Sequence, residues 1–532
     1  MEAPMRCKWS SWLELLLLYG LLFWCAATER QTTTTTTTIQ TPSFACVTLD
    51  WWPATKCDFD HCTWNNSALW AVNLEELKPY ARVLSPFVLR LGGSLQDYVD
   101  YRPNGCDYAS PNQFPVNASM PQRFGHGCID QTKLLKIFDF CHDVGCQIVW
   151  GLNGMHGRSL DGQGAWNSTN SRQLLEFFHQ HKAPLLGVTL GNEIWAIKVN
   201  LTVQQAFDTY AELDSILSSI WTTTPRPLIA GFDGNGWSLK FPFYQELLPK
   251  LATNNIRLDV LNYHDYPLGS SDDEDVVNKA LSYQAYQKAR DLAEQAHATA
   301  KLYSNNLAVW VSESGGSYDS GSLAATGSYG SGFWYLSNLA ATHAAGNAHF
   351  CRQTLTGGFY GLTTFDNPKR PHPDFWNTVL YNRLMGPPTG LTVNSLGRST
   401  SDDQESPSVQ WTIHCSKRHH PTSVAILALN YDRYRTHEVQ LATWKYPILA
   451  YRLTPAGGTN ATNANATSLN GQVLEFQPDG SLPELNGELL KNTNVLTVAP
   501  LTYAFFEIIG FYSGSSSNPC AGDGTSGAAT DA

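Results

Sequence analysis

The sequence reads LGVTLGNEIW at residues 186–195 and LAVWVSESGG at residues 307–316. Each stretch is a short apolar run that ends in a glutamate beside glycine, asparagine or serine. This pattern is typical of a buried parallel strand whose last residue enters a polar site. Glu193 and Glu313 are therefore a candidate pair of carboxylates, although a single glutamate of this kind could equally close a strand against solvent.

Eight such apolar runs follow one another over about 310 residues, and helical patterns separate many of them. The clearest helix has apolar residues from Val203 to Ile220 at spacings of three and four. Strands that alternate with helices predict a (β/α)8 TIM barrel, and a doubly wound open sheet is the alternative. No glycine-rich phosphate-binding motif follows the first strand, which disfavours the open sheet. The eight predicted strands are 44–52, 87–94, 147–153, 187–193, 228–234, 258–266, 308–315 and 350–358, and the other predicted helices are 132–144, 172–181, 275–301 and 333–345.

Beyond residue 386 the pattern changes to short β-rich stretches at 409–414, 423–430, 437–442 and 502–509. They are separated by Gly, Pro, Asn and Asp, which is typical of a β-sandwich. A chain of 532 residues is long enough for two domains. The predicted organisation is a signal peptide at 1–27, a Thr-rich stalk at 28–42, a barrel at 43–385, a sandwich at 386–512 and a disordered tail at 513–532.

The N-terminus has the features of an export signal. Arg6 and Lys8 precede an apolar run, and Cys25-Ala26-Ala27 offers a cleavage site, although an uncleaved anchor is the alternative. Ten cysteines remain after residue 27, an even number that predicts disulfides with open pairing. No clustered Cys/His spacing suggests a metal site, and no cofactor is expected. Six N-x-S/T sequons predict glycosylation at Asn65, Asn117, Asn167, Asn200, Asn460 and Asn465.

The charge balance limits the choice of partner. The formal net charge is -11, and only 15% of residues are charged. Nucleic-acid binding requires clustered Lys and Arg to neutralise phosphates, so no nucleic acid partner is expected. The 17 Trp and 23 Tyr residues are compatible with sugar binding. Export further allows peripheral association with a membrane surface or a cell wall.

The strand ends carry the chemistry of a candidate glycosidase. In a TIM barrel all strands end on the face that holds the active site, so Glu193 on the fourth strand and Glu313 on the seventh can face one pocket. Retaining glycosidases hold two carboxyl groups about 5 to 5.5 Å apart, one as nucleophile and the other as acid/base. His264 or Tyr266 could orient a carboxylate or a sugar hydroxyl. Arg90 is better explained as a buried ion-pair partner.

These stretches resemble the heparanase-like proteins of glycoside hydrolase family 79. The similarity runs over residues 44–511, and the order and spacing of the motifs carry it. The matching stretches are 47–50 (VTLD), 89–94 (LRLGGS), 150–153 (WGLN), 166–168 (WNS), 190–193 (LGNE), 263–266 (YHDY), 309–314 (VWVSES), 351–353 (CRQ) and 358–360 (GFY).

The resemblance implies a retaining β-glucuronidase-type activity, with Glu193 as acid/base and Glu313 as nucleophile. Asn192 would bind the 2-hydroxyl group, and backbone amides near Asp319 and Ser320 would hold the sugar carboxylate. The other residues implied in substrate binding line the glucuronate subsite or touch sugar hydroxyls: Asp50, Ser94, Tyr318 and Tyr360.

The sequence departs from the animal members of the family at several points. Ile194 stands where they have a proline, and Asp319 and Ser320 stand where they have two glycines. The stretch 96–147 is shorter than theirs, so proteolytic maturation is not expected. Few basic residues follow the fifth and sixth strands, whereas sulfate recognition favours Arg and Lys.

The sequence therefore predicts a secreted, glycosylated retaining hydrolase. Its partner would be an oligo- or polysaccharide that contains uronic acid, and a weakly charged arabinogalactan-type glucuronide fits better than sulfated heparan. Two alternatives stay open: a retaining β-glycosidase of the same clan that acts on neutral sugars, and a carbohydrate-binding protein without catalysis.

Overall fold

The computed structural model describes residues 42–65, 67–107, 113–194, 201–223, 225–366, 368–399, 407–442, 446–456, 462–491, 493–513 and 518–521. The predicted signal peptide, all but the last residue of the predicted Thr-rich stalk and the sequons at Asn200 and Asn460 lie outside these residues. Residues from 42 onward belong to one compact unit. Among the described residues, no helix combines the length and the apolar character that a membrane crossing requires.

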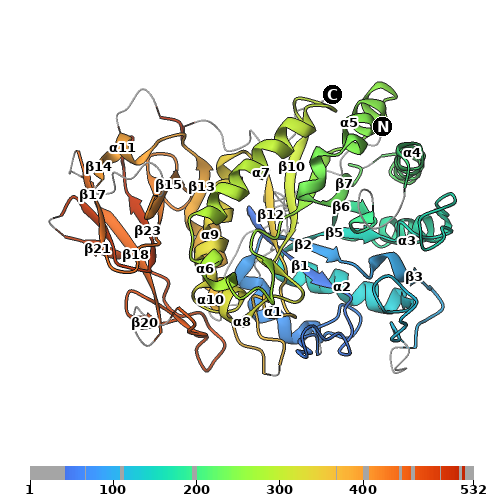
Figure 1. Ribbon diagram of the computed structural model, residues 1–532, viewed down its shortest axis with the longest axis horizontal. Helices are drawn as coiled ribbons and strands as arrows, with labels where there is room; N and C mark the ends of the chain where they lie inside the picture. The colour runs from blue at the N-terminus through green and yellow to red at the C-terminus, as the bar shows by residue number, and fades with distance from the viewer. Residues whose placement is uncertain are drawn as a thin grey trace, which may run out of the picture. The chain divides into compact units, whose positions relative to one another are not determined.

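Eight parallel strands form a closed barrel, which confirms the predicted fold (Figure 1). Their residues are almost entirely buried, as expected for parallel strands that are covered on both faces. Each predicted strand corresponds to one barrel strand. In order around the barrel these are β1 (Ala45–Asp50), β2 (Phe87–Gly92), β5 (Cys146–Leu152), β6 (Leu185–Leu190), β7 (Leu228–Asn235), β8 (Val260–His264), β10 (Ala308–Ser314) and β12 (His349–Arg352).

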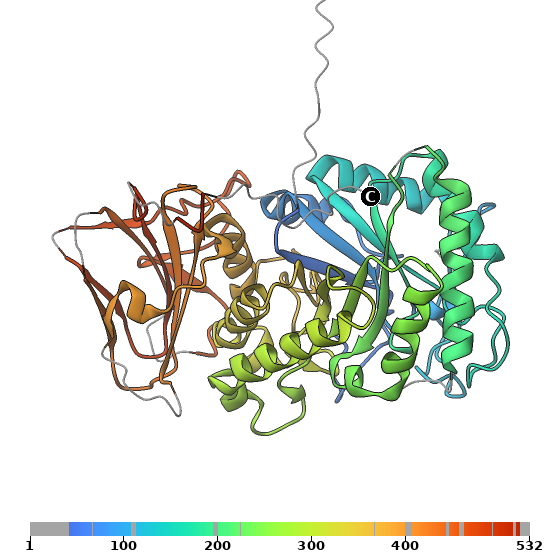
Figure 2. The ribbon, with the colours of Figure 1, turned by 90° about the horizontal axis from the view of Figure 1, so that it is seen from above.

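Helices surround the barrel, as the view from above shows (Figure 2). The predicted helix at 203–220 is α4 (Val203–Ile220), and it begins with a capping box in which Thr202 and Gln205 satisfy each other's backbone N–H groups. The single helix predicted at 275–301 is wrong, because it is interrupted at residues 281–283. The helices of this part are α1 (Leu74–Leu84), α2 (Gln131–Val144), α3 (Thr169–Gln180), α4, α5 (Pro242–Thr253), α6 (Val276–Ala280), α7 (Gln284–Ala300), α8 (Leu323–Thr326), α9 (Ser331–Ala344) and α10 (Pro373–Leu384).

Two antiparallel sheets follow the barrel, which confirms the predicted β-sandwich. The interior side chains of both sheets share one apolar core, for example Ile426 and Phe506 of the larger sheet with Val439 and Leu496 of the smaller one. The smaller sheet contains β14 (Gly397–Ser399), β17 (His437–Leu441) and β22 (Val495–Val498). The larger sheet contains β13 (Met385–Pro388), β15 (Val409–Ser416), β16 (Val424–Asn430), β23 (Tyr503–Ile508), β18 (Ile448–Pro455), β19 (Thr467–Leu469), β20 (Gln472–Val473) and β21 (Glu488–Leu490).

The outer face of the larger sheet continues the core of the barrel. Tyr503 of β23 stacks on Tyr329 at a ring separation of 4.7 Å, and the Tyr329 hydroxyl donates to the Leu453 carbonyl oxygen at 2.8 Å. Phe505 and Leu427 belong to the same cluster as the side chains of α9 and α10. Apolar burial of this kind stabilises by about 25 cal/mol per Å2. The sandwich is therefore attached to the barrel through an apolar contact.

All ten cysteines after residue 27 form disulfides, as the even number predicts. The pairs are Cys46–Cys351, Cys57–Cys62, Cys106–Cys128, Cys141–Cys146 and Cys415–Cys520. Cys520 is buried, so the chain is attached to β15 at a point where the sequence predicts a disordered tail.

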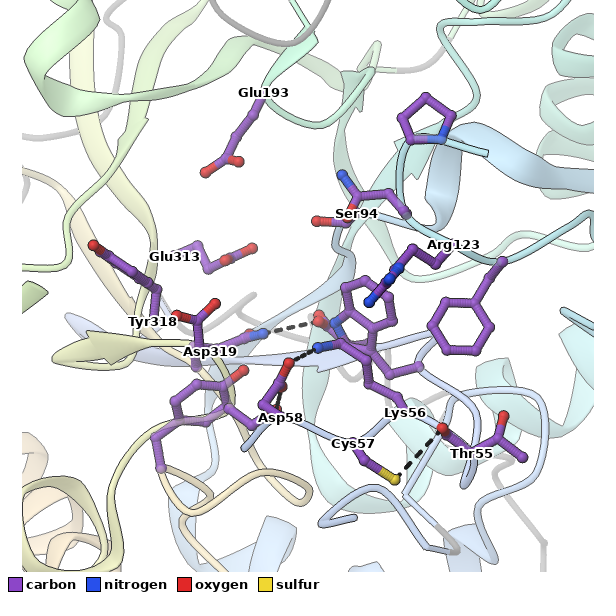
Figure 3. Close-up of a pocket in the computed structure, with 18 of the residues that line it drawn as sticks. Thr55, Lys56, Cys57, Asp58, Ser94, Arg123, Glu193, Glu313, Tyr318 and Asp319 are labelled. Carbon is purple, nitrogen blue, oxygen red and sulfur yellow. Dashed lines mark hydrogen bonds and ion pairs between the residues drawn. The ribbon is translucent and has the colours of Figure 1, made fainter. Parts of the chain in front are cut away.

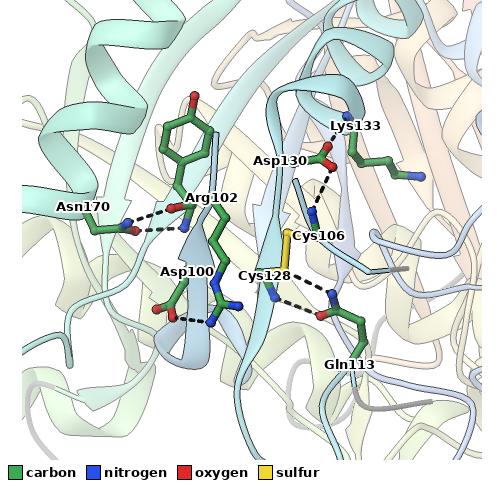
Figure 4. The surroundings of a disulfide bond; sticks show 9 residues. Asp100, Arg102, Cys106, Gln113, Cys128, Asp130, Lys133 and Asn170 are labelled. Atoms are coloured by element: carbon green, nitrogen blue, oxygen red, sulfur yellow. Dashed lines mark hydrogen bonds and ion pairs between the residues drawn. A yellow bond between two sulfur atoms is a disulfide. The ribbon is translucent and has the colours of Figure 1, made fainter. Parts of the chain in front are cut away.

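The disulfide between Cys106 and Cys128 lies beside the start of α2 (Figure 4). Asp130 accepts from the backbone N–H of Cys106 and caps α2 by accepting from that of Lys133. Gln113 accepts from the backbone N–H of Cys128 at 2.9 Å. The disulfide and these bonds fix the long connection between β3 (Val99–Tyr101) and β4 (Gly127–Ile129), which supplies part of the cavity described next.

Candidate active site

A cavity of about 630 Å3 opens where the barrel strands end. Glu193 and Glu313 both line it, and Figure 3 shows the two carboxyl groups on the same side of the cavity. Glu313 is the penultimate residue of β10, next to an irregularity in its pairing with β8. Glu193 lies three residues beyond the end of β6 and has a φ of 55°, where its backbone N–H donates to the Asp233 carbonyl oxygen at 2.7 Å. The structure thus brings together the two carboxylates that the sequence predicts.

Arg90 lies beneath the cavity, where it is almost completely buried. Its guanidinium donates to Glu313 Oε2 at 2.7 Å, to Asn192 Oδ1 at 2.8 Å and to Asp233 Oδ2 at 3.0 Å. Burial alone would lower the pKa of Arg90, but Asp233 and Glu313 more than offset this and raise it. The prediction that Arg90 is a buried ion-pair partner is confirmed, and one of its partners is a candidate catalytic residue.

His264, at the end of β8, connects the two carboxylates. Its Nδ1 lies 2.9 Å from Glu193 Oε1 and 4.0 Å from Glu313 Oε1, and its Nε2 lies 3.4 Å from Asp233 Oδ1. Burial would lower the pKa of His264, but the surrounding carboxylates, first Glu313 and then Asp233 and Glu193, raise it to about 9. The imidazole is therefore protonated at neutral pH.

Asp233 is the buried counter-ion of both cations. Besides Arg90 and His264, it accepts from Asn262 Nδ2 at 2.6 Å and from Ser312 Oγ at 2.7 Å. Burial would raise the pKa of Asp233, but Arg90 and His264 hold it well below its ordinary value. Asp233 was not predicted as a site residue. The feature of the sequence that could have pointed to it is that Asp233 is the one carboxylate inside the apolar run 228–234.

Tyr266 and Asp50 border Glu313 in the cavity wall. The Tyr266 hydroxyl donates to Glu313 Oε1 at 2.6 Å. Asp50 Oδ2 accepts from Gln353 Nε2 at 2.8 Å, and its Oδ1 has no hydrogen-bond partner among the described residues. Burial, and then the charge of Glu313, raise the pKa of Asp50. Gly93 has a φ of 96°, and a Cβ there would lie 2.5 Å from Asp50 Oδ1, so only glycine fits beside this carboxyl group.

The loop after β10 has a left-handed backbone at two residues that are not glycine. Asp319 and Ser320 have φ values of 58° and 64°. Ser320 Oγ accepts from Trp64 Nε1 at 2.8 Å and donates to Asp58, while Asp319 Oδ2 accepts from Ser270 Oγ at 3.2 Å. These contacts offset a left-handed conformation that costs about 1 to 2 kcal/mol per residue.

The predicted substrate-binding residues divide into two groups. Asp50, Ser94, Tyr266, Tyr318 and Tyr360 line the cavity. Asn192 and His264 are not among its lining residues; both are buried beneath it, where they contact Arg90 and Glu193 respectively. A direct contact of Asn192 with a sugar hydroxyl therefore stays a prediction. The cavity also contains Lys56 and Arg123, which the sequence did not single out because both lie in loops without a recognisable motif.

Comparison with known proteins identifies the family of the chain. The model of glycosyl hydrolase family 79, N-terminal domain, matches residues 28–340. The chain is 28% identical to baicalin-β-D-glucuronidase of Scutellaria baicalensis over 93% of this chain and 95% of that protein. It is 30% identical to heparanase-like protein 2 of Arabidopsis thaliana over 75% of this chain and 72% of that protein.

A solved structure shares the fold. The crystal structure of a 4-O-α-L-rhamnosyl-β-D-glucuronidase from Fusarium oxysporum matches with a TM-score of 0.57 and 15% identity, over 89% of this chain and 98% of that chain. This likeness concerns the fold alone. The family model covers more than half of the chain, and the relatives cover most of it. The chain therefore belongs to glycosyl hydrolase family 79.

Proposed function

We propose that this glycoside hydrolase is a secreted retaining enzyme that removes β-linked glucuronate-type residues from glycans. One observation carries the proposal: oxygen atoms of Glu193 and Glu313 lie 2.9 and 4.0 Å from the same nitrogen of His264. These distances limit the separation of the two oxygens to about 7 Å, which fits the roughly 5 to 5.5 Å of retaining enzymes better than the roughly 6.5 to 9.5 Å of inverting ones.

The contacts around the pair support a division of roles between the two glutamates. Arg90 and His264 are two cations that contact three carboxyl groups, those of Asp233, Glu193 and Glu313. Glu313 accepts hydrogen bonds from both Arg90 and Tyr266, which fix the orientation of its carboxyl group. These contacts suit a nucleophile, so we assign that role to Glu313 and the role of proton donor to Glu193, as the family resemblance implies.

Hydrolysis would then proceed in two displacements. The Glu313 carboxylate attacks the anomeric carbon, the bond to the leaving oxygen breaks, and Glu193 gives its proton to that oxygen. In the second step Glu193 takes a proton from water, the resulting hydroxide attacks the same carbon, and the bond to Glu313 breaks. Arg90 and Tyr266 hold the Glu313 carboxylate in place through both steps.

Glucuronate as the sugar is supported by the names of the relatives, a β-D-glucuronidase and heparanase-like proteins. Tyr318 and Tyr360, which the family resemblance places in the glucuronate subsite, lie in the wall of the cavity. Export is supported by the disulfides and by the exposure of the four described sequon asparagines, Asn65, Asn117, Asn167 and Asn465. Peripheral association with a membrane surface or a cell wall remains part of the proposal.

A panel of aryl glycosides tests the proposal. We expect the aryl β-D-glucuronide to be hydrolysed with a higher kcat/KM than the aryl β-D-glucoside, and NMR to show first the β-anomer of the product. Equal turnover of both glycosides would exclude the uronate preference, and an α-anomer would exclude retention.

Two variants separate the roles of the glutamates. Glu313→Gln should lower kcat by at least about 10^4-fold on every substrate, because the nucleophile is lost. Glu193→Gln should spare the first step for a 4-nitrophenyl leaving group, which needs no proton, so that a burst of nitrophenol precedes slow turnover. Glu294→Gln, an exposed residue of α7, is the control. An active Glu313→Gln variant would contradict the assigned nucleophile.

A further inference from the structure

Two basic side chains line the cavity, and the proposed hydrolytic steps use neither of them. Lys56 comes from the loop after β1, and Arg123 from the connection between β3 and β4. Figure 3 shows both side chains on the part of the cavity wall away from Glu193. Both side chains are therefore placed where they can contact a bound substrate.

Lys56 is held in place by its neighbours. It forms an ion pair with Asp58, and its Nζ lies 5.0 Å from the centre of the Trp52 ring. The other oxygen of Asp58 accepts from Ser320, so Asp58 links the lysine to the loop after β10. An ammonium group has three N–H donors. The ion pair engages one Asp58 oxygen, and the side chain remains 18% exposed at the cavity.

Arg123 is presented by an unusual backbone. Its φ is 62°, although arginine rarely adopts this region, and two turn hydrogen bonds of 2.8 Å fix it, from Arg123 N–H to Met120 and from Asn117 N–H to Arg123. The next residue, Phe124, packs against Trp52 at 5.8 Å. Trp52 therefore contacts both Lys56 and the neighbour of Arg123. Among the described residues the guanidinium forms no hydrogen bond or ion pair.

The rest of the cavity is rich in carboxyl groups. Glu193, Glu313, Asp58 and Asp319 all line it, so an anionic sugar that enters would be repelled unless cations compensate. Burial, and then the charges of Asp58 and Asp272, raise the pKa of the half-buried Asp319 carboxyl group, whereas the Ser270 hydrogen bond and the charge of Lys56 oppose this rise. Lys56 and Arg123 are the lining cations of the cavity in the described part of the chain.

We propose that Lys56 and Arg123 form a cationic wall that binds an oxyanion of the substrate, either a carboxylate or a sulfate ester. The proposal rests on the proposed glycosidase function and adds a determinant of substrate class to it. The oxyanion has two candidate sources: the carboxylate of the cleaved sugar, or an acidic group on the neighbouring unit. Both present the same chemistry to an ammonium and a guanidinium group.

Kinetics on three substrates distinguish these sources. The substrates are a 4-nitrophenyl β-D-glucuronide, the matching β-D-glucoside, and an aryl β-D-glucuronide whose aryl group carries a sulfonate. If the wall binds the cleaved sugar, Lys56→Gln and Arg123→Gln each lower the glucuronide-to-glucoside ratio of kcat/KM about five- to tenfold, through KM. If the wall binds the neighbouring unit, the two variants instead lower the ratio of kcat/KM for the sulfonated aryl glucuronide to kcat/KM for the 4-nitrophenyl glucuronide. Either result supports the wall.

Controls separate the wall from general effects. Lys301→Gln removes an exposed lysine at the end of α7 and should change neither ratio. Lys56→Arg keeps the positive charge, so it should retain most of the preference for the anionic over the neutral substrate. High salt should weaken this preference in the wild type. Unchanged ratios in Lys56→Gln, Arg123→Gln and the double variant would overturn the proposal.

Binding measurements test the wall even if the enzyme hydrolyses none of these glycosides. Calorimetry with D-glucuronate, phenyl sulfate and D-glucose compares the wild type with the double variant. Loss of the preference for either anion over glucose supports the wall, and equal affinities in both proteins overturn it. Absence of turnover with intact anion binding would contradict the proposed function alone.

Discussion

Arg90 is the residue on which the geometry of the proposed site depends. It donates to a candidate catalytic carboxylate, to Asn192 and to the buried Asp233, and it comes from a strand more than one hundred residues away from each of them. A buried ion pair of this kind is costly to assemble, and removal of one partner leaves the other charge uncompensated.

We therefore expect Arg90→Met to lower the free energy of unfolding by about 3 to 5 kcal/mol and to abolish activity. Arg90→Lys keeps the positive charge but loses the planar guanidinium whose two terminal nitrogens donate to different partners. It should therefore be more stable than Arg90→Met but still poorly active. Urea denaturation and the glucuronide assay measure the two effects. Arg290→Met, at an exposed position of α7, is the control, and a loss below about 1 kcal/mol in Arg90→Met would contradict the role of this cluster.

Asp319 and Ser320 have left-handed φ values, a backbone that glycine adopts at little cost. Trp64, Asp58 and Ser270 bind the two side chains in this conformation. These stabilising contacts come from other loops, and no local pattern indicates them.

At the level of elements, the predicted strands and most helices agree with the structure because apolar periodicity reports burial directly. The exception is the segment 275–301, where α6 and α7 replace one continuous helix. Tyr283 and Tyr286 stack at 5.2 Å across this junction, and Tyr283 contacts Tyr431 of the sandwich at 6.1 Å. A tertiary contact therefore accompanies the break.

Helix α4 follows the loop that carries Glu193, and its start is fixed by the capping box of Thr202 and Gln205. Thr202→Ala removes the acceptor for the Gln205 backbone N–H at 3.2 Å. We expect it to lower the free energy of unfolding by about 1 kcal/mol. Thermal unfolding measures this effect, and Ser215→Ala on the exposed face of the same helix is the control. Equal stability of the two variants would show that the cap contributes nothing.

At the scale of the whole molecule, the partly buried His343 and the buried His414 lie where the barrel meets the sandwich. His343 of α9 and His414 of β15 have ring centroids 4.8 Å apart, and His414 Nδ1 donates to the Gly386 carbonyl oxygen at 2.7 Å. Burial lowers the pKa of His414 to about 4, and the hydrogen bond to Gly386, which by itself raises the pKa, offsets only part of this effect. This junction is therefore built from neutral imidazoles.

The junction should weaken in acid. The pKa of His414 is about 4 in the folded chain and about 6.5 unfolded, so its stabilising contribution is complete above pH 6.5 and is lost as pH falls towards 4. Between pH 6.5 and 4 we expect the wild type to lose up to about 3 kcal/mol of its free energy of unfolding relative to His414→Gln, which has no imidazole to protonate. Urea denaturation at several pH values measures it. Ser215→Ala, which removes no titratable group, is the control, and a pH-independent difference for His414→Gln would contradict the prediction.

The sequence by itself determined the barrel, the sandwich and the two strand-end glutamates, because strand burial and strand order follow from local apolar patterns. The sequence suggested His264 or Tyr266 beside a carboxylate, and the tertiary structure decided how these and the other groups surround the two glutamates. Asp233, His264 and Arg90 meet below the cavity from three different strands, the disulfide partners Cys46 and Cys351 are 305 positions apart, and Lys56 and Arg123 share a wall through Trp52. Such contacts depend on barrel closure and on loop packing, which no periodicity along the chain records.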